Sequence, residues 1–495
     1  MEPTVSLPLY SGLVLLVSAI RGGELVISKR NRRTLHATGV GAVGEPHFRA
    51  MVILHVAVLA GALLEAWVTR RSLRMGLAVP ALGLLVGASA LRWWVIATLG
   101  PHWNVAIMDS IGSARAVVTH GPYAHIRHPN YVAVFAELLA LPLVHGAWLT
   151  AAAGAVAHVW VLRHRIRAEE SVLLAHPSYR AVMAQRPRFL PRPLLTSLEH
   201  AWDVVRLGRP LFLLGGLALY GLGVAASPGL IRGQLFWLGL GAVCCLQLMT
   251  HYSNEYFDYA ADSANRTPTA WSGGSRVLCE GRLPRWAALV AALVAAGLGL
   301  ALAVVIRRVA GLLPAALLVG IAALSWTYSA PPGRLHSRGL GEVDGALVVT
   351  VLVPLFALAL HAPGLTGLRP LLLATVPPGC LQFAMLMAVA IPDAAADAQV
   401  GKRTLAVRLG STWAWRTHAA ATALAYATVP VLYVAGLPRA VALAALVVAP
   451  FAARHLARMS RGRALQSPNW PALTFWPAAL LILTTAAEAV AFLLL

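Results

Sequence analysis

The stretch NEYFDYAAD, residues 254–262, places three carboxylates at the end of a long apolar run. Asn254, Asp258 and Asp262 recur every four residues, so on a helix they form one stripe, with Glu255 beside it. Carboxylates stacked in this way repel one another, and at a membrane interface they are costly unless a cation offsets them. Oxygen ligands of this kind suit Mg²⁺, which commonly bridges to substrate phosphates. The stripe predicts a magnesium site with Asn254, Glu255, Asp258 and Asp262 as ligands.

A second acidic pair has the same spacing. The segment IPDAAADAQVGKRTLAVRLG carries Asp393 and Asp397, and basic residues follow them. Two acidic pairs that face one pocket could hold Mg²⁺ against a diphosphate, and nearby cations could neutralise the remaining phosphate charge. The candidates for that role are Arg266, Arg276, Lys402 and Arg403. The alternative is that each cluster is a solvated loop end, but two such repeats at the ends of apolar runs favour a functional site.

A third cluster lies in the first half of the chain. The segment GPYAHIRHPNYVAVF, residues 121–135, opens one apolar run, and RHRIRAEESVLLAHPSYRAVMAQRPRFLP, residues 163–191, follows the next. The two segments bring His128, Glu169 and Glu170 near one interface. Taken alone, the glutamate pair is better explained as a charged helix end in an Arg-rich segment than as a site.

The elements that position these residues are long apolar runs. The chain has 495 residues, of which 58% are hydrophobic and only 12% are charged, against about 25% charged in a soluble domain. Runs of about 20 apolar residues can span a bilayer as helices, whereas open sheets cannot satisfy their backbone in lipid. The sequence therefore predicts an all-α polytopic membrane protein.

A polar, Arg- and Pro-containing stretch over residues 164–210 divides the chain. We place a boundary near residue 195, which predicts one domain over 1–195 and another over 196–495. About five spans are expected before the boundary, near 5–20, 49–68, 76–98, 130–146 and 148–163. About nine are expected after it, near 211–227, 233–253, 285–305, 309–329, 343–361, 370–390, 413–435, 438–453 and 471–494.

The net charge of +21 does not indicate a nucleic-acid partner, because the basic residues gather in short loops between apolar runs. In the second half these loops share one side of the membrane, which the positive-inside rule makes cytoplasmic. We expect a multi-pass protein of a bacterial-type inner membrane, with the residue-195 linker and the sites inside and both termini outside. The loop with Arg70, Arg71 and Arg74 disagrees with this arrangement.

The second half resembles the UbiA superfamily of intramembrane prenyltransferases. NEYFDYAAD is similar to that family's NDxxDxxxD motif, DAAAD with GKRTLAVRLG is similar to its second Asp motif, and YSAPPGRLHSRGLGE, residues 328–342, resembles a loop of the dihydroxynaphthoate prenyltransferase branch. The resemblance covers about residues 200–495. It implies a UbiA-type helical bundle and Mg²⁺-dependent transfer from a prenyl diphosphate to an aromatic acceptor. The implied catalytic residues are Asn254, Asp258, Asp262, Asp393, Asp397 and Tyr328.

Two positions depart from the family pattern. Glu255 replaces the usual first Asp, and Pro332 stands where some members have Lys, with Arg334 as the nearest substitute.

The first half resembles the isoprenylcysteine carboxyl methyltransferase family, which binds S-adenosylmethionine. The family's Arg-His-Pro-x-Tyr stretch, Glu-Glu pair and downstream Tyr and Arg correspond to Arg127, His128, Pro129, Tyr131, Glu169, Glu170, Tyr179 and either Arg186 or Arg188. The resemblance implies that His128, Pro129, Tyr131, Glu169, Glu170 and Tyr179 bind the cofactor. Residues 21–67 are similar to a bacterial subgroup that methylates hydroxyls of alkylpyrones and alkylresorcinols, with Glu24, Ser28, Asn31, His47, His55 and Glu65 as matching polar positions.

These features predict a bifunctional membrane enzyme that prenylates an aromatic or phenolic acceptor and O-methylates a lipophilic phenol or carboxylate. Its expected partners are a prenyl diphosphate, a lipophilic aromatic acceptor and membrane lipid. One alternative is an active prenyltransferase with a lipid-binding, non-catalytic first half. Another is a transporter, but transporter sites lie near the bilayer midplane, whereas these acidic clusters lie at the ends of spans.

Overall fold

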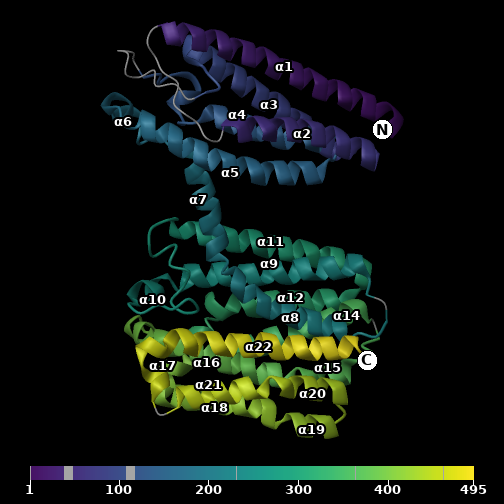
Figure 1. Ribbon diagram of the computed structural model, residues 1–495. Helices are drawn as coiled ribbons and strands as arrows, with labels where there is room; N and C mark the ends of the chain where they lie inside the picture. Colours follow the sequence, from purple (N-terminus) through teal and green to yellow (C-terminus); the bar gives the residue numbers. More distant parts are fainter. Residues whose placement is uncertain (1, 38–47, 107–116, 230, 363, 461) are drawn as a thin grey trace. The chain divides into compact units, whose positions relative to one another are not determined.

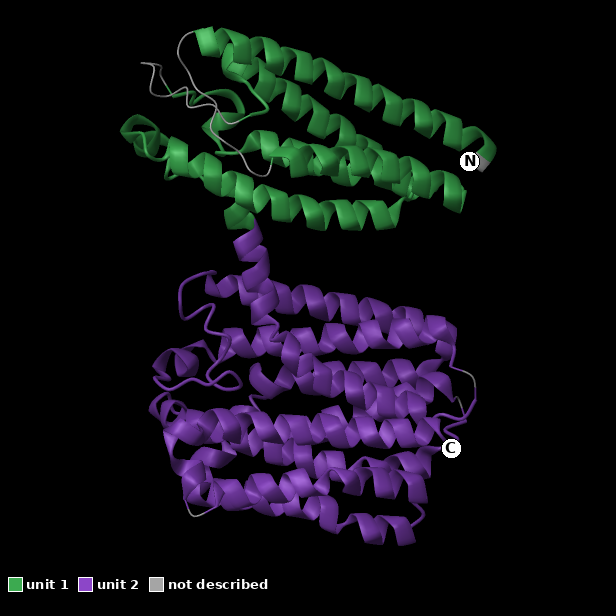
Figure 2. Ribbon diagram, viewed as in Figure 1, with its two compact units in different colours: residues 1–197 green, residues 198–495 purple. Residues whose placement is uncertain are grey.

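The computed structural model describes residues 2–37, 48–106, 117–229, 231–362, 364–460 and 462–495. Every regular element in these ranges is a helix or a helical turn, as Figure 1 shows, so the predicted all-helical class is confirmed. The chain divides into two compact units, residues 1–197 and 198–495 (Figure 2). The dividing point lies within helix α7, Arg192–Leu207.

The N-terminal unit is built from five longer helices that run alongside one another (Figure 1). These are α1 (Pro3–Ala37), α2 (Phe48–Thr69), α3 (Met75–Leu99), α4 (Pro129–Val144) and α5 (Trp148–Leu173), with short elements η1 (Gly100–His102), η2 (Gly121–Ala124) and α6 (Pro177–Met183). The helix α1 is much longer than the predicted span 5–20, because it continues through a polar segment up to Ala37. The helices α4 and α5, which are joined by the short turn around Gly146, pack against each other.

Buried ion pairs join α1 to α3 and α4. Arg92 donates two hydrogen bonds to the carboxylate of Glu24, over 2.7 and 2.6 Å, and Arg21 contacts both Glu24 and Glu137. Glu24, Arg92 and Glu137 are buried. Charges inside an apolar bundle are tolerated when they are paired in this way. Glu24, one of the polar positions shared with the methyltransferase subgroup, therefore holds helices together.

Other polar positions of that subgroup also make local structural contacts. The Ser28 and Asn31 side chains of α1 bind the segment around residues 100–105, with Asn31 donating to the Trp103 carbonyl over 2.8 Å. Glu65 accepts hydrogen bonds from the backbone N–H groups of residues 149 and 150, at the start of α5, where free N–H groups favour a carboxylate. Glu65 is thus a helix cap. His47 lies outside the described residues.

The C-terminal unit contains helix in all nine regions expected to span. These are α8 (Pro210–Ala225), α9 (Gly233–Phe257), α11 (Arg285–Ala310), α12 (Leu312–Ser329), α13 (Gly341–Ala346) with the π-helical turn η4 (Leu347–Leu352) and α14 (Val353–His361), α15 (Leu368–Ala374) with α16 (Val376–Gln399), α18 (Ser411–Ala427) with α19 (Val429–Val434), α20 (Arg439–Val447) with α21 (Ala449–Met459), and α22 (Trp470–Leu493). Short elements connect them: α10 (Tyr259–Ala264), α17 (Leu405–Leu409), η3 (His336–Arg338), η5 (Arg463–Leu465) and η6 (Ser467–Asn469).

Several of these apolar rods are interrupted at prolines. Pro377 follows the break between α15 and α16, Pro430 the break between α18 and α19, and Pro450 the break between α20 and α21. Proline lacks the N–H that the helical ladder requires, so a break just before it is the expected outcome, and here each break lies two residues before the proline. By length and composition, ten helices in the described residues are long and apolar enough to cross a membrane, or eleven if the pair α7–α8, bent by 47°, forms one span.

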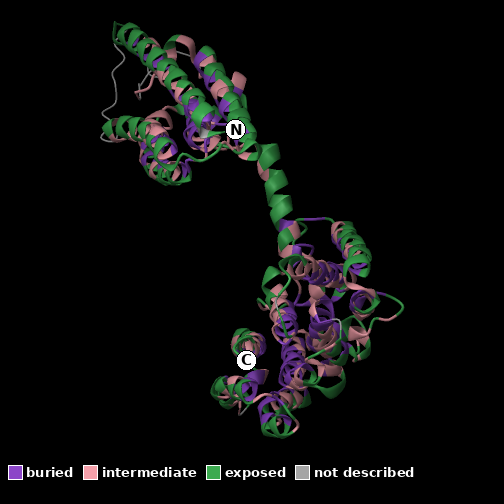
Figure 3. Ribbon diagram, turned by 90° about the vertical axis from the view of Figure 1, so that its right-hand side faces the viewer, coloured by how far each residue is buried: buried purple, intermediate pink, exposed green. Residues whose placement is uncertain are grey.

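The outer faces of the helices are apolar. Leu149 is 76% exposed, Trp237 is 69% exposed and Val434 is 85% exposed. Figure 3 shows the buried residues gathered in the interior of the C-terminal unit and the exposed ones on its outer surfaces. Large apolar side chains on the outside are favourable in contact with lipid and unfavourable in contact with water. The chain is an integral, multi-pass membrane protein.

Close packing between α8 and α14 depends on a glycine. A Cβ atom at Gly223 would lie 2.2 Å from the Pro354 carbonyl oxygen and 2.8 Å from the Ala357 Cβ. On the same helix, a Cβ atom at Gly221 would have no neighbour within 4 Å. Small residues at such crossings let helix backbones approach closely inside a membrane.

We predict that Gly223→Ala lowers the thermal unfolding midpoint of the full-length protein in detergent, whereas Gly221→Ala leaves it unchanged or raises it. Both substitutions gain about 0.5–1 kcal/mol of helix stability, but only the first forces an overpacked contact, which costs about 1–3 kcal/mol. Equal midpoints for the two variants would show that the α8–α14 contact does not limit stability.

Candidate active sites

Lys402 joins the two acidic motifs of the C-terminal unit. Its Nζ lies 2.7 Å from an Asp258 carboxylate oxygen and 3.3 Å from an Asp397 carboxylate oxygen. The sequence explains this position. The helix α16 ends in a Schellman motif, with Gly401 at φ 78° and the Lys402 N–H bonded to the Asp397 carbonyl over 3.0 Å. This turn folds Lys402 back beside the acidic end of its own helix.

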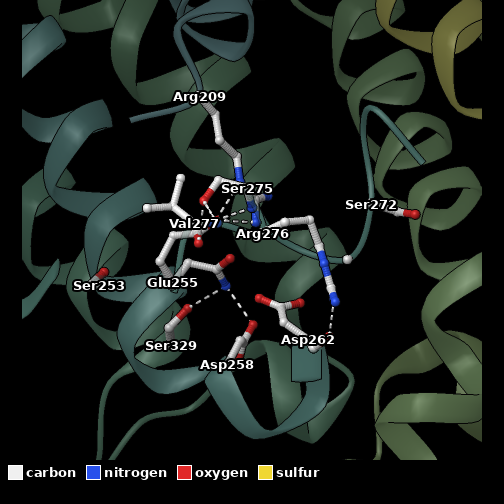
Figure 4. Close-up of polar contacts among 12 residues, drawn as sticks. Arg209, Ser253, Glu255, Asp258, Asp262, Ser272, Ser275, Arg276, Val277 and Ser329 are labelled. Carbon is white, nitrogen blue, oxygen red and sulfur yellow. Dashed lines mark hydrogen bonds and ion pairs between the residues drawn. The ribbon is translucent and has the colours of Figure 1, made fainter. Parts of the chain in front are cut away.

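The first motif lies where α9 gives way to α10. Asn254 Nδ2 donates to Asp258 Oδ2 over 2.6 Å and to Ser329 Oγ over 3.1 Å, contacts drawn in Figure 4. Burial opposes ionisation of Asp258, but the Lys402 ammonium outweighs it and lowers the pKa of Asp258 below its ordinary value. Burial raises the pKa of Asp262 to about 7, and the charges of Asp258 and Glu255 add to this effect.

The loop after α10 fastens the first motif to the second. Asn265 Nδ2 donates to Asp393 Oδ1 over 2.7 Å, and the Gly273 N–H donates to Asp393 Oδ2 over 3.1 Å. A side chain at Gly274 would have its Cβ 2.4 Å from Asp262 Oδ2, and Gly274 has φ 73°. A glycine is therefore required for the loop to pass this close to the carboxylate.

The motifs surround one end of a cavity of about 230 Å³. Asn254, Asp258, Asp262, Asp393, Asp397 and Lys402 contribute to its polar lining. Its remaining lining includes apolar side chains such as Leu246, Ile321, Val353 and Leu481. The arrangement offers a charged end for an anionic group and an apolar wall for a hydrocarbon chain.

Glu255, which we predicted as a metal ligand, does not line this cavity. Its carboxylate accepts hydrogen bonds from Arg209 Nε over 2.8 Å and from the Ser275 N–H and hydroxyl over 2.7 and 2.8 Å (Figure 4). One residue along a helix is a turn of about 100°, so the neighbour of Asn254 faces another direction. The structure gives Glu255 a different role, which is to hold Arg209. Arg209 itself lines the cavity, and sequence reasoning missed it.

Among the four cations expected to meet a diphosphate, only Lys402 lines the cavity. Arg266 and Arg403 are exposed. Arg276 donates to the Asp262 backbone carbonyl. The order of residues in a loop does not show which side chains turn toward the cavity. Arg209, just before Pro210 at the start of α8, lines the cavity in place of the arginines that were expected there.

Tyr328, which the family resemblance implies to be catalytic, lines the cavity near the end of α12. Its ring stacks on His336, with centroids 5.2 Å apart and planes at 17°, and its hydroxyl lies 3.3 Å from His336 Nδ1. Arg334, considered as the substitute for the family lysine, is exposed and does not line the cavity. His336 lines it instead.

The carboxylates at the cavity suit a Mg²⁺ ion that also binds a substrate phosphate. Within the described ranges, no three His, Cys, Asp or Glu side chains form a ready-made cage for one bare ion. Mg²⁺ usually keeps several waters and is held by one or two carboxylates together with substrate phosphates. Two acidic pairs around a shared anion satisfy that requirement, so Asp258, Asp262, Asp393 and Asp397 can hold the metal once a diphosphate is present.

The predicted cofactor residues of the N-terminal unit also meet. His128 Nε2 lies 3.0 Å from Glu170 Oε1, and Arg127 and Arg188 pair with the same carboxylate over 3.0 and 2.6 Å. Backbone bonds from residues 127 and 128 to the carbonyls of Pro187 and Arg188 hold the two loops together. Burial opposes ionisation of Glu170, but hydrogen bonds from His128 and Arg188 lower the pKa of Glu170 to about 2.

The second glutamate has a different environment. The Tyr131 hydroxyl donates to Glu169 Oε2 over 2.6 Å and accepts from Arg165 Nε over 2.9 Å. Pro129 is the first residue of α4, and its side chain and that of Tyr179 are buried. Arg186 binds the Tyr123 carbonyl. The Glu170 charge is already neutralised by two arginines, so Glu169 is the carboxylate better suited to an ammonium ligand.

Two buried polar atoms next to this cluster lack partners in the described part of the chain. They are Arg127 Nε, a donor, and Asn130 Oδ1, an acceptor. Buried polar groups are normally hydrogen-bonded, and a ligand that carries both an acceptor and a donor would satisfy these two atoms. The amino-acid end of S-adenosylmethionine, with an ammonium and a carboxylate, has that chemistry.

Comparison with known proteins gives two family matches. Residues 81–176 match the isoprenylcysteine carboxyl methyltransferase (ICMT) family, and residues 214–487 match the UbiA prenyltransferase family. The predicted identities of the two halves, and their order, are confirmed.

The individual relatives share only a modest sequence identity with this chain. The chain is 27% identical over 164 residues to the uncharacterized protein YpbQ of Bacillus subtilis, covering 32% of this chain and 94% of that protein. It is 31% identical over 158 residues to an uncharacterized protein of Haemophilus influenzae, covering 32% of this chain and 90% of that protein. A solved structure of a UbiA homologue from Archaeoglobus fulgidus, bound to GPP and Mg²⁺, is similar with 18% identity and a TM-score of 0.45, covering 59% of this chain and 100% of that one.

We predict that Lys402→Met lowers the unfolding midpoint in metal-free buffer and increases the stabilisation that added Mg²⁺ provides. Removing one partner of a buried ion pair costs about 3–5 kcal/mol, because the remaining charges are left uncompensated. A divalent cation can then replace the missing ammonium. Arg266→Met removes an exposed cation away from the cavity and serves as the matched control. Identical Mg²⁺ responses in both variants and the unmodified protein would rule out Lys402 as the internal counter-ion.

Proposed function

We propose that this chain, which belongs to the UbiA prenyltransferase family, is a bifunctional membrane enzyme. Its C-terminal part, residues 196–495, transfers a prenyl group from a prenyl diphosphate to a lipophilic aromatic acceptor. Its N-terminal part, residues 1–195, uses S-adenosylmethionine to O-methylate a lipophilic phenol or carboxylate, such as an alkylresorcinol, an alkylpyrone or a quinone precursor. The observation that carries the first activity is the pair of acidic motifs facing one cavity with an apolar wall.

The diphosphate would bind at the acidic end of the cavity. Mg²⁺ held there by Asp258, Asp262, Asp393 and Asp397 would offset the negative charge of the diphosphate as it leaves. Asn254 orients Asp258 through its 2.6 Å hydrogen bond. Lys402 and Arg209 supply the positive charges that line the same end, and Glu255 fixes Arg209 in place.

The apolar lining has a chemical role in this proposal. Ionisation of a prenyl diphosphate leaves an allylic cation, which water would destroy. Side chains such as Leu246 and Ile321 exclude water from that part of the cavity. Tyr328 lines the cavity, where its ring could stabilise a nearby cation, and stacking on His336 fixes the orientation of that ring.

Methyl transfer is supported by the family match and by the cluster around His128. S-adenosylmethionine supplies an already activated methyl group, so the task of the protein is alignment of acceptor oxygen, methyl carbon and sulfur. Glu169, Asn130 and Arg127 would bind the amino-acid end of the cofactor. A fused pair of enzymes keeps a lipophilic product close to the second site, which raises its effective concentration there.

We predict that each activity can be removed without the other. Asp258→Asn or Asp397→Asn should reduce prenyl transfer by about a thousandfold or more, since electrostatic stabilisation of this kind is usually the largest catalytic term, while leaving S-adenosylmethionine binding intact. Glu169→Gln should weaken S-adenosylmethionine binding by about tenfold, the loss expected for a hydrogen bond to a charged group, while leaving prenyl transfer intact. Each variant is the control for the other.

Both quantities can be measured on the purified full-length protein, by radiolabelled prenyl transfer and by equilibrium binding of S-adenosylmethionine. Full prenyl transfer by the Asp variants in saturating Mg²⁺ would refute the metal site. No S-adenosylmethionine binding by the unmodified protein would instead favour a lipid-binding, non-catalytic N-terminal half.

We also propose that the sites open to the cytoplasm of a bacterial-type inner membrane, where both charged cosubstrates are made and where basic loops are retained. We predict that a cysteine introduced at the exposed position Ser197 reacts with a membrane-impermeant thiol reagent only after the membrane is opened. Labelling of that cysteine in intact cells would place the linker outside and refute the assigned orientation. The chain without the added cysteine reports the background from its four native cysteines.

A further inference from the structure

The cavity has a second acidic wall that the proposed prenyl transfer does not use. Glu342 and Asp344, both in the short helix α13, line the cavity together with the metal-site carboxylates. Glu342 is 1% exposed, and neither of its carboxyl oxygens has a hydrogen-bond partner in the described part of the chain. A buried carboxyl group that lines a cavity without a partner indicates that a ligand supplies the partner.

This wall lies beside the stacked Tyr328–His336 pair. A Cβ atom at Gly341, the residue before Glu342, would lie 3.0 Å from His336 Nδ1, so the start of α13 packs directly on the His336 side chain. The amide of Gln382 lines the same cavity, and a Cβ atom at Gly345 would lie 3.9 Å from its Nε2. The unpaired carboxyl group therefore belongs to the part of the cavity lining that adjoins His336 and Gln382.

We infer that Glu342, assisted by Asp344, binds a hydroxyl group of the acceptor, and that the acceptor is an uncharged hydroxylated aromatic ring. The inference rests on the proposed prenyl transfer and names its substrate class. A hydroxyl can pair with a carboxyl group in either protonation state, because it is both a donor and an acceptor. Specificity of this kind is strong, since an analogue without the hydroxyl leaves the buried carboxyl group unpaired again.

The same geometry disfavours an aromatic carboxylate. Among the described Arg and Lys side chains, Arg209 and Lys402 line the cavity, and both are already paired with protein carboxylates. The ionised forms of Glu342 and Asp344 would repel a second anion beside them, and neither cation is free to offset that repulsion. The dihydroxynaphthoate type of acceptor, suggested by the resemblance of the 328–342 loop, is thereby disfavoured.

An acceptor series tests the class with the unmodified protein. The series is 5-pentylbenzene-1,3-diol, its dimethyl ether and its 2-carboxylic acid, each supplied with geranyl diphosphate and Mg²⁺ to the full-length protein in lipid nanodiscs. We expect prenylation of the diol, with kcat/KM at least about tenfold lower for the ether and for the acid. An acid or an ether used as well as the diol would overturn the inference.

A pair of isosteric variants tests the residue. Glu342→Gln should raise KM for the diol by about tenfold and leave Mg²⁺-dependent binding of geranyl diphosphate unchanged. Glu488→Gln is the matched control, because Glu488 in α22 is equally buried, has two unpartnered oxygens in the described part of the chain and does not line the cavity. It should leave KM unchanged. An unchanged KM in Glu342→Gln, or the same rise in both variants, would overturn the assignment.

The failure of this inference can be distinguished from failure of the proposed function. If none of the three acceptors is prenylated while geranyl diphosphate still binds in a Mg²⁺-dependent way, the acceptor class is wrong and the diphosphate site stands. If the unmodified protein shows no Mg²⁺-dependent binding of geranyl diphosphate, the proposed prenyl transfer itself is wrong.

Discussion

The ammonium group of Lys402 holds together two carboxylates that would otherwise repel each other, Asp258 of the first motif and Asp397 of the second. Its position follows from a local rule, since a Schellman turn at Gly401 ends α16 and brings Lys402 back to the helix that carries Asp397. The loop that binds Asp393 and the glycine beside Asp262 complete the enclosure. The rest of the bundle can be understood as the scaffold that keeps these acids close while excluding water.

This ion pairing also explains how the site could change state. Without a ligand, a protein cation offsets the acidic charge. With a diphosphate and Mg²⁺ bound as proposed, Asp258 and Asp397 would hold the metal, and Lys402 would be free to bind a phosphate oxygen. Arg209 is held separately by Glu255 and does not have to move. In the N-terminal unit Glu170 is neutralised by Arg127 and Arg188, which leaves Glu169 for a ligand.

Sequence reasoning succeeded where periodicity decides the outcome. The four-residue spacing on α9 and α16 brought Asn254, Asp258, Asp393 and Asp397 to one cavity, and the lengths of the apolar runs located the helices. It failed where the direction of a side chain depends on the path of a loop or on a shift of one residue along a helix. Glu255 turns away from the cavity because it is one residue off the stripe, and Arg266 and Arg403 lie on loops that expose them. Arg209 and Glu342 were missed because their importance comes from what they face, and no spacing reveals that.

The central claim is that the two acidic motifs and Lys402 form one site for a metal-bound diphosphate. The most direct measurement is an experimental structure of the full-length protein with Mg²⁺ and a non-hydrolysable geranyl thiodiphosphate. We predict metal density between the diphosphate and the carboxylates of both motifs, with Lys402 Nζ moved from Asp258 and Asp397 to a phosphate oxygen. Diphosphate bound elsewhere, with Lys402 still bridging the two carboxylates, would contradict the account.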